Sequence, residues 1–211
     1  MKRWILIGIA VLVGLLVIVD VGARFAAEAA TAKALTSSLE LSSQPKVSIG
    51  GVPFLPHLLS GSFPSVTVEG QQVDSGELTL ERVHAVLKDV HVPVLSLARG
   101  NRTTVTAASG TGTAVLSAAE ITRVLQKRGT GVTVEFTGGR VRLQAPGVPA
   151  FIDATVGVES GQLVLRAAAL PQLGVGLPQV IPGVRYTTAR IAGDEAVLGF
   201  KLDDVTFAVG G

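Results

Sequence analysis

The segment PKVSIGGVPFLPHLLSGSFPSVTVEG, residues 45–70, contains two kinds of pattern side by side. At its ends, PKVSI (45–49) and SVTVEGQQV (65–73) alternate apolar with polar residues, as a strand with one buried face does. Between them, VPFLPHLL is too apolar for an exposed loop and too rich in proline for a regular strand or a long helix. The segment therefore predicts two strands joined by a short apolar insertion.

The insertion has the signals of a very short helix. Pro56 is tolerated only in a first helical turn, and Gly61 favours a helix end, so we expect one or two turns between them. Five apolar side chains would be displayed by these turns or flank them, and we predict that they bind lipid: Phe54, Leu55, Leu58, Leu59 and Phe63. Two interpretations stay open. The insertion is a lid that completes the core at the open end of a sheet, or it lines or gates a lipid cavity or dips into a bilayer.

The alternating pattern continues along the rest of the chain, in residues 77–92, 102–109, 113–117, 132–137, 140–145, 150–160, 162–168 and 196–209. Glycine-containing breaks at 74–76, 138–139, 160–161 and 193–194 are typical of hairpin turns. We therefore predict a strand-dominated α+β fold built on a long antiparallel meander with one apolar face. Residues 170–184 are expected to form an irregular apolar loop.

One clear helix interrupts the strands. Ser117 and Glu120 form a capping box, and Lys127-Arg128-Gly129 ends the helix. The helix places three apolar residues on one face, which we expect in the wall of the same lipid site: Ile121, Val124 and Leu125. A second helix or turn is expected at 94–99. No low-complexity linker divides residues 45–211, so we treat them as one domain.

The N-terminus, MKRWILIGIAVLVGLLVIVDVGAR, has the pattern of an export or anchor signal. Lys2 and Arg3 precede a run that is apolar from Trp4 to Val19, and positive charge on this side keeps the N-terminus in the cytoplasm. We expect residues 1–23 to be either a retained transmembrane anchor or a cleaved signal, with the anchor favoured. Residues 24–44, rich in alanine up to position 41, are expected to continue as a helix into the domain and to end before Pro45.

The composition excludes several classes of function. The formal net charge of +2 is too small for a nucleic-acid-binding face, which needs dense positive charge. The absence of cysteine excludes a thiolate nucleophile, a disulfide and a zinc–sulfur site. The mean hydropathy of +0.51 is high for a globular protein, although aromatic residues make up only 4%.

The residues that support catalysis or metal binding do not form a recognisable set. His84 and His91 are an odd number of positions apart on one predicted strand, so they point to opposite faces. Asp203 and Asp204 are adjacent, and a solvated turn or bulge is a better interpretation than an acid–base pair. We predict no enzyme, no metal site and no cofactor. An enzyme acting on glycolipids would need these two carboxylates inside a pocket.

Basic residues occur in small groups. Arg140 and Arg142 share one face of a predicted strand, with Val141 and Leu143 on the other. They are either part of a solvated outer face or a contact for an anionic lipid head group.

The segment from Pro45 to Gly70 resembles the LmeA-like phospholipid-binding family of actinobacterial envelope proteins. The similar pattern is a strand, a Gly-x-Pro-Phe-Leu motif, further leucines, a glycine and a second strand. In this chain it falls on Gly51, Pro53, Phe54, Leu55, Leu58, Leu59 and Gly61. Pro56 and His57 depart from the small polar residue and glutamine that the family pattern has there.

The resemblance implies a tubular lipid-binding fold, in which a long curved sheet wraps one or two helices and encloses an apolar cavity. It also implies phospholipid binding, notably of the phosphatidylinositol type, and a role in envelope maintenance and in elongation of lipid-anchored mannan. We therefore expect an exported protein of the cell envelope, attached to the cytoplasmic membrane, with phospholipid and membrane as partners. The alternative is a membrane-anchored scaffold that binds another envelope protein through its apolar face.

Overall fold

The computed structural model describes residues 2–38, 43–74, 77–94, 96, 99, 102–168, 170–179 and 183–209, with side chains from Leu12 to Thr206 within these ranges. Its helices are α1 (Lys2–Ser38), α2 (Phe54–Ser60) and α4 (Ala118–Lys127). Its strands are β1 (Lys46–Ile49), β2 (Ser62–Asp74), β3 (Thr79–His91), β4 (Thr103–Ser117), β5 (Thr133–Thr137), β6 (Arg140–Gln144), β7 (Ile152–Glu159), β8 (Gln162–Ala167), β9 (Leu173–Gly176), β10 (Val184–Ala192) and β11 (Glu195–Val209).

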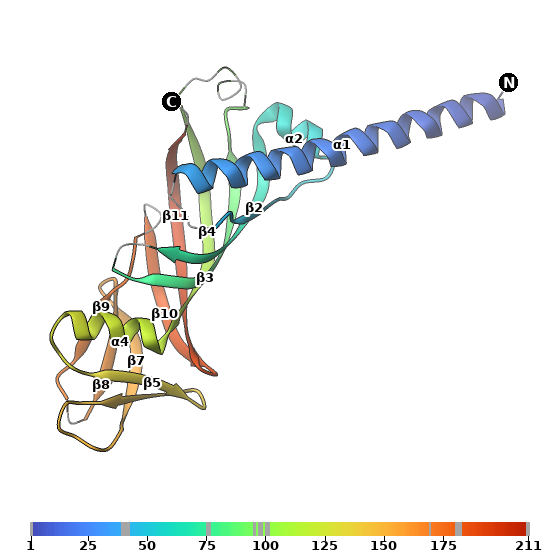
Figure 1. The fold of residues 1–211 in the computed structure, drawn as a ribbon. Helices are drawn as coiled ribbons and strands as arrows, with labels where there is room; N and C mark the ends of the chain where they lie inside the picture. The colour runs from blue at the N-terminus through green and yellow to red at the C-terminus, as the bar shows by residue number, and fades with distance from the viewer. Residues whose placement is uncertain are drawn as a thin grey trace.

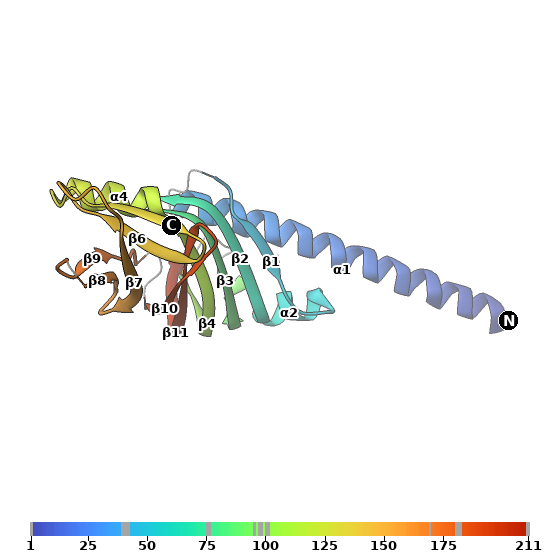
Figure 2. The ribbon, with the colours of Figure 1, turned by 90° about the horizontal axis from the view of Figure 1, so that it is seen from below.

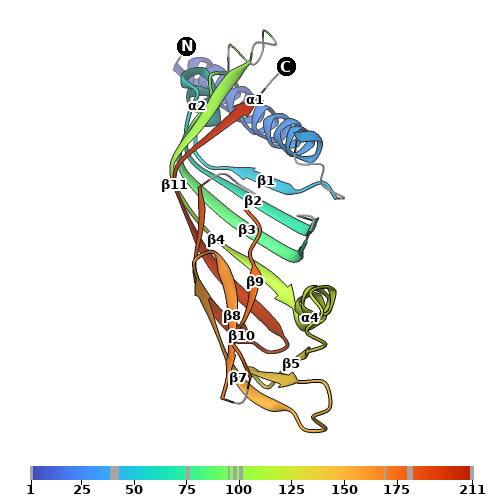
Figure 3. The same ribbon diagram turned by 90° about the vertical axis from the view of Figure 1, so that its left-hand side faces the viewer.

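The described strands form two antiparallel sheets (Figure 1). The first has six strands in the order β1-β2-β3-β4-β11-β10, and the second has five in the order β5-β6-β7-β8-β9. The first sheet is curved, with α1 over one end and α4 on the same side at the other end (Figure 3). The predicted fold class, a strand-dominated α+β protein with a curved antiparallel sheet, is confirmed. The prediction of a single meander is wrong, because the strands form two sheets. After β4 the chain forms the second sheet, β5–β9, and then returns to the first sheet, where β11 pairs with β4 and β10 pairs with β11.

Each strand of the six-stranded sheet has one apolar and one polar face. In β3, for example, Val83, Ala85 and Leu87 point to one side, while Arg82, His84 and Lys88 point to the other. The apolar side, which we call the inner face, is the side that carries the buried core residues of all six strands. The polar side is the outer face.

Three residues with positive φ interrupt the alternation of the long strands. Gln72, Asp89 and Asp204 have positive φ within β2, β3 and β11, and each is skipped in the residue pairing, which resumes in the same register beyond it. Asp203 and Asp204, predicted to lie in a solvated turn or bulge, are both exposed, and Asp204 lies at the interruption in β11.

Helix α1 is continuous and longer than the segment predicted to lie in the domain. The predicted helix from residue 23 is present as far as Ser38, and residues 39–42 lie outside the described part of the chain. Asp20, Arg24 and Glu28 recur at one-turn spacing in its middle and contact one another or the domain. Within the described residues, no helix is long and apolar enough to cross a membrane, so the predicted transmembrane segment is not supported.

Several strand boundaries differ from the predicted ones. Residues 103–117 form one strand, β4, where two were expected, because Gly110 and Gly112 stay extended within the sheet. Strands β9 and β10 occupy much of 173–192, where an irregular loop and no strand were predicted. The turns at 138–139, 160–161 and 193–194 are confirmed. The turn at 74–76 and the segment 94–99 lie partly outside the described residues.

Candidate functional site

Helix α2 begins and ends as its sequence predicts. It runs from Phe54 to Ser60, with Pro56 in its first turn, where a missing N–H costs nothing. Gly61 ends it in a left-handed conformation with φ 69°. A Cβ atom at Gly61 would overlap the carbonyl group of Val92, so this helix end requires glycine.

The apolar side chains of α2 divide into an inner and an outer set. Phe54 is buried and stacks on the buried Phe63 of β2, with 5.8 Å between ring centroids. Leu55 and Leu58 are half-buried, and Leu58 packs on the core. Leu59, in contrast, is 82% exposed, and Val52 just before the helix is 84% exposed. Helix α2 therefore closes part of the core and also presents apolar side chains to its surroundings.

Asp20 of α1 holds the N-terminus of α2. Its carboxylate accepts hydrogen bonds from the backbone N–H groups of Phe54 (2.8 Å) and Leu55 (2.7 Å). The residue at the helix start, Pro53, makes no side-chain capping bond, so Asp20 supplies from a distant helix what a capping residue normally supplies locally. These two bonds, with smaller effects from Arg24 and His57, hold the pKa of the Asp20 carboxyl below its usual value.

One to two turns further along, α1 is bound to the edge strand β1 through Arg24 and Glu28. Glu28 accepts a hydrogen bond from the backbone N–H of Ile49 at 2.8 Å and pairs with Arg24 at 2.9 Å. Arg24 in turn reaches the hydroxyl group of Ser48 at 3.3 Å. Helix α1 from Asp20 onward is thus attached to both α2 and β1.

The inner face of the six-stranded sheet is apolar but not fully covered. Its strands carry fully buried residues such as Leu80 and Leu202, yet other inner-face side chains keep part of their surface accessible, among them Val68, Val83, Leu87 and Val105. Gly110 and Gly112 of β4 make room for neighbouring side chains, because the added Cβ atoms would press on Leu87 and Leu202 at the first position and on the Phe200 ring at the second. This partly open apolar face is suited to an apolar ligand.

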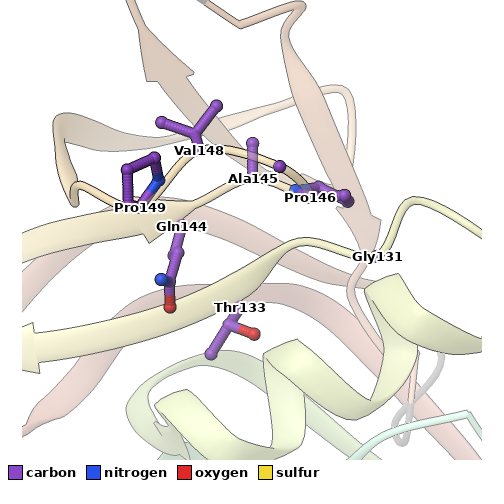
Figure 4. Close-up of a pocket in the computed structure, with 8 residues that line it drawn as sticks. Gly131, Thr133, Gln144, Ala145, Pro146, Val148 and Pro149 are labelled. Carbon is purple, nitrogen blue, oxygen red and sulfur yellow. The ribbon is translucent and has the colours of Figure 1, made fainter.

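A small pocket adjoins the end of α2. It has a volume of about 210 Å³ and is bordered by residues of the α2 terminus and of the chain after β3: Leu59, Ser60, Gly61, His91, Val92, Pro93, Val94 and Ser96. A larger open pocket of about 620 Å³ lies at the other end of the molecule, between the start of β5 and the segment that follows β6 (Figure 4). Thr133 and Gln144, which are paired across the two strands, and the apolar Pro146 and Val148 line it.

The predicted wall residues on α4 are placed far from α2. Ile121, Val124 and Leu125 are buried, and α4 packs on β4, β5 and β9 (Figures 1 and 3). The N-cap half of the predicted capping box is present, since Ser117 accepts from the N–H of Glu120, whereas the carboxylate of Glu120 accepts from the N–H of Thr79 at 2.5 Å. A bond from Arg123 and this one hold the pKa of Glu120 below its usual value. The structure therefore does not bring the α2 and α4 residues together.

The predicted head-group residues lie on the second sheet. Arg140 is exposed, and Arg142 is half-buried with its guanidinium 5.4 Å from the ring centroid of Phe151. Arg142 also lies 3.9 Å from a carboxylate oxygen of Glu135. Both arginines project from the face of β6 opposite to the buried Val141 and Leu143.

The described residues give no support to a metal site or to the carboxylate pair as a catalytic dyad. Among them, no group of His, Asp and Glu is placed to hold a metal ion. Asp203 is exposed and pairs with Arg185 on the neighbouring strand. Glycolipid hydrolysis by Asp203 and Asp204 is therefore unsupported by the geometry.

The sequence analysis assigned no role to Asp20, which directly follows the apolar run from Trp4 to Val19. The spacing of Asp20, Arg24 and Glu28 was the available signal, because charges four residues apart share one face of a helix. Charged residues on one face of a helix, directly after an apolar run, indicate where that helix begins to contact the domain.

Comparison with known proteins identifies the family of the chain. The family model described as LmeA-like phospholipid-binding matches residues 18–211. No curated protein and no solved structure matches the chain. The match starts two residues before Asp20 and takes in the attached part of α1, helix α2 and both sheets (Figure 2). Since it covers nearly the whole sequence, the chain belongs to the LmeA-like phospholipid-binding family.

Proposed function

We propose that this protein takes a phospholipid from a membrane and holds its acyl chains against the inner face of the six-stranded sheet. Family membership supports binding of phospholipid. The observation that carries the location is the row of partly accessible apolar side chains on that face, which includes Val68, Val83 and Leu87. Each methylene of an acyl chain that leaves water there contributes about 0.8 kcal/mol.

In this proposal, α2 borders the entrance. Phe54 and Phe63 fix the helix to the sheet, while Leu55, Leu58 and Leu59 face the route by which an acyl chain reaches the inner face. Arg140 and Arg142 stay a prediction for contact with an anionic head group. They lie on β6, which pairs with β5 and β7 at the end of the molecule opposite to α2 (Figure 1), so a direct role at this entrance is unsupported. We propose a phosphatidylinositol-type lipid as the first ligand to test, and envelope or mannan lipoglycan biogenesis as the process served.

We also propose that the domain works in the cell envelope, outside the cytoplasmic membrane. The support is Lys2 and Arg3 before the apolar run of α1, since such charges favour retention of the N-terminus on the cytoplasmic side. No catalytic step is part of the proposal.

A matched pair of variants on β3 tests the location. Val83 and Val86 are both half-buried valines on one strand, but Val83 faces inward between Gly70 and Ala114, while Val86 faces outward between Thr67 and Thr111. The full chain should carry phospholipid through mild purification, detected by native mass spectrometry. Val83→Glu should lower the bound fraction by at least about tenfold, because it places a charge among acyl chains, and Val86→Glu should leave it unchanged.

Three results would count against the proposal. They are a lipid-free wild-type protein after mild purification in the presence of phospholipid, equal loss in both variants, and no loss in either. Circular dichroism and thermal unfolding of both variants confirm that they are folded before the comparison is made.

The scaffold alternative is favoured by a separate feature. Val148 (38% exposed) and Phe151 (41% exposed) lie on the segment that borders the larger pocket, or next to it, away from α2. If a protein partner binds there, Val148→Asp should abolish its capture while phospholipid stays bound.

A further inference from the structure

The part of α1 before Asp20 is apolar on every side. Apart from Gly14, each residue from Leu12 to Val19 is Leu, Val or Ile, and the exposed fractions of these side chains run from 53% to 69%. Eight consecutive positions pass more than twice around a helix, so no single side is polar. We call residues 12–19 the apolar arm. It projects away from both sheets (Figures 1 and 2).

The apolar arm is exposed on all sides, and this restricts what can cover it. A groove on a protein or a second copy of the chain covers one side of a helix and leaves the other side in water. A helix that is apolar all round needs a medium that surrounds it, and the apolar layer of a lipid bilayer is such a medium. The family's ligand, a phospholipid, comes from the same source.

Asp20 marks where the arm ends. The next residues that face the domain are Ala23, Arg24, Ala27 and Glu28, which are partly or largely covered. A charged carboxylate is costly in the apolar layer of a bilayer, so we expect Asp20 to lie at the level of the polar head groups. Its carboxylate is bonded to the first residues of α2. The same bonds place the start of α2 at that level.

Helix α2 adds two apolar side chains beside this boundary. Val52 stands two residues before the amide of Phe54 that Asp20 binds, and Leu59 lies in the last turn of α2. With exposed fractions of 84% and 82%, they are the most exposed large apolar residues that the structure describes, and Ile18 of the apolar arm follows at 69%. Val52 and Leu59 together form what we call the α2 tip.

We propose that the apolar arm and the α2 tip form one surface that docks on a phospholipid bilayer, with Asp20 fixing α2 at the depth of the head groups. This inference rests on the proposed function and adds where the lipid enters. Leu59 also borders the small pocket beside α2, so docking brings this pocket against the membrane. A lipid then passes from the bilayer toward the inner face without crossing water.

The chain has no cysteine, so a single introduced thiol carries a fluorophore at one known place. The full chain with Leu59→Cys or Val52→Cys is labelled and mixed with phosphatidylcholine vesicles whose acyl chains carry a quencher. Zwitterionic vesicles avoid simple attraction of the positively charged protein. Lys127→Cys at the exposed end of α4 is the control, because α4 lies at the other end of the molecule.

We expect labels at 52 and 59 to be quenched at a depth of about 5–10 Å below the surface, and the label at 127 to stay in water. Asp20→Asn should make label 59 shallower or broaden its distribution of depths, while the apolar arm keeps the protein on the vesicles. The proposal is overturned if vesicle-bound protein leaves label 59 as unquenched as label 127. The role of Asp20 is overturned if Asp20→Asn leaves the depth of label 59 unchanged.

Lipid retention, measured on the same proteins by native mass spectrometry, separates the two proposals. Quenching at 59 without bound lipid supports docking and contradicts the proposed function. Bound lipid with label 59 in water supports the proposed function and contradicts docking through the α2 tip.

Discussion

Asp20 is one side chain that determines the position of a whole helix. Its two acceptor bonds replace the missing local cap of α2, and they join parts of the chain more than thirty residues apart. A carboxylate can accept both bonds with separate oxygens, whereas an asparagine has one acceptor oxygen and a donor group in place of the other. The attachment of α2 to α1 is therefore weakened by Asp20→Asn, although the two side chains have nearly the same size and shape.

We predict that Asp20→Asn loosens the start of α2 and leaves the sheets intact. Amide hydrogen exchange at Phe54 and Leu55 should become about five- to tenfold faster, the size of effect expected for loss of a helix cap. Amides in β3 and β4 should exchange as before. Asp194→Asn, on an exposed turn of the same chain, is the control and should change neither region.

The pH dependence of this contact has a defined direction. The folded pKa of Asp20 is lowered from 3.8, so its contribution is fully present above that value and is lost as pH falls through the lower folded value. The protection factors at Phe54 and Leu55 should stay constant from neutral pH to about 4 and fall below it. In Asp20→Asn the same factors should be low throughout. A fall that begins well above pH 4 would contradict the assignment of this effect to Asp20.

At the scale of the element, strand β4 determines how closely side chains approach on the inner face. A Cβ atom on Gly112 would overlap the carbonyl oxygen of His84 and the ring of Phe200, and the first of these is backbone. At Gly157 in β7, the nearest atom to an added Cβ would be Arg166 Nη1 at 3.8 Å. Both glycines are extended, so the comparison isolates the effect of space.

Gly112→Ala should therefore lower the free energy of unfolding by about 1–3 kcal/mol, as overpacking does. Gly157→Ala should be neutral or raise it by about 0.4–1 kcal/mol, because alanine restricts the unfolded chain. Urea unfolding of the two variants measures both. Equal effects would show that the inner face tolerates added volume at Gly112.

The sequence predicted elements well where the pattern was local. The limits of α2 follow from Pro56 and Gly61, and the cap of α4 follows from Ser117 and Glu120, because these effects act within one or two turns. The division into two sheets was not predictable, since which strand pairs with β4 depends on contacts between distant segments such as β11. Strand β10 was missed because VRYTTARIA lies on an edge and its alternation is broken by a register shift near Thr187.

The candidate site was predictable in part for the same reason. The apolar character of Phe54 to Leu59 is visible in the sequence, but only the fold shows that Phe54 is buried and Leu59 exposed. The partly open inner face depends on several strands together, so no local pattern could identify Val83 or Val105 as its members.

At the scale of the whole molecule, α1 is a structural part of the domain from Asp20 onward. Ala32 is buried, and Ala23, Ala27 and Leu35 pack on the core along one side of the helix. Cleavage after Ala23, which the sequence allows, would remove Asp20 and leave α2 without its cap.

We predict that a chain of residues 24–211 unfolds at a lower temperature than a chain of residues 18–211, which retains Asp20. Thermal unfolding of the two truncated chains tests this, and hydrogen exchange at Phe54 and Leu55 should show the difference most strongly. Identical unfolding temperatures and exchange would mean that the attachment of α1 contributes little.

The bond from the N–H of Ile49 to Glu28 has a consequence for how the chain behaves outside its native fold. Strand β1 is one edge of the six-stranded sheet, and an edge amide without a partner is a place where another chain can add a strand. The carboxylate of Glu28 accepts the hydrogen bond of that amide, and Glu28 precedes β1 in the chain, so it is synthesised first. Helix α1 is therefore available to cover this edge as soon as β1 forms. Any event that detaches α1 leaves the Ile49 amide free to pair with a strand of another chain, and so favours self-association through β1.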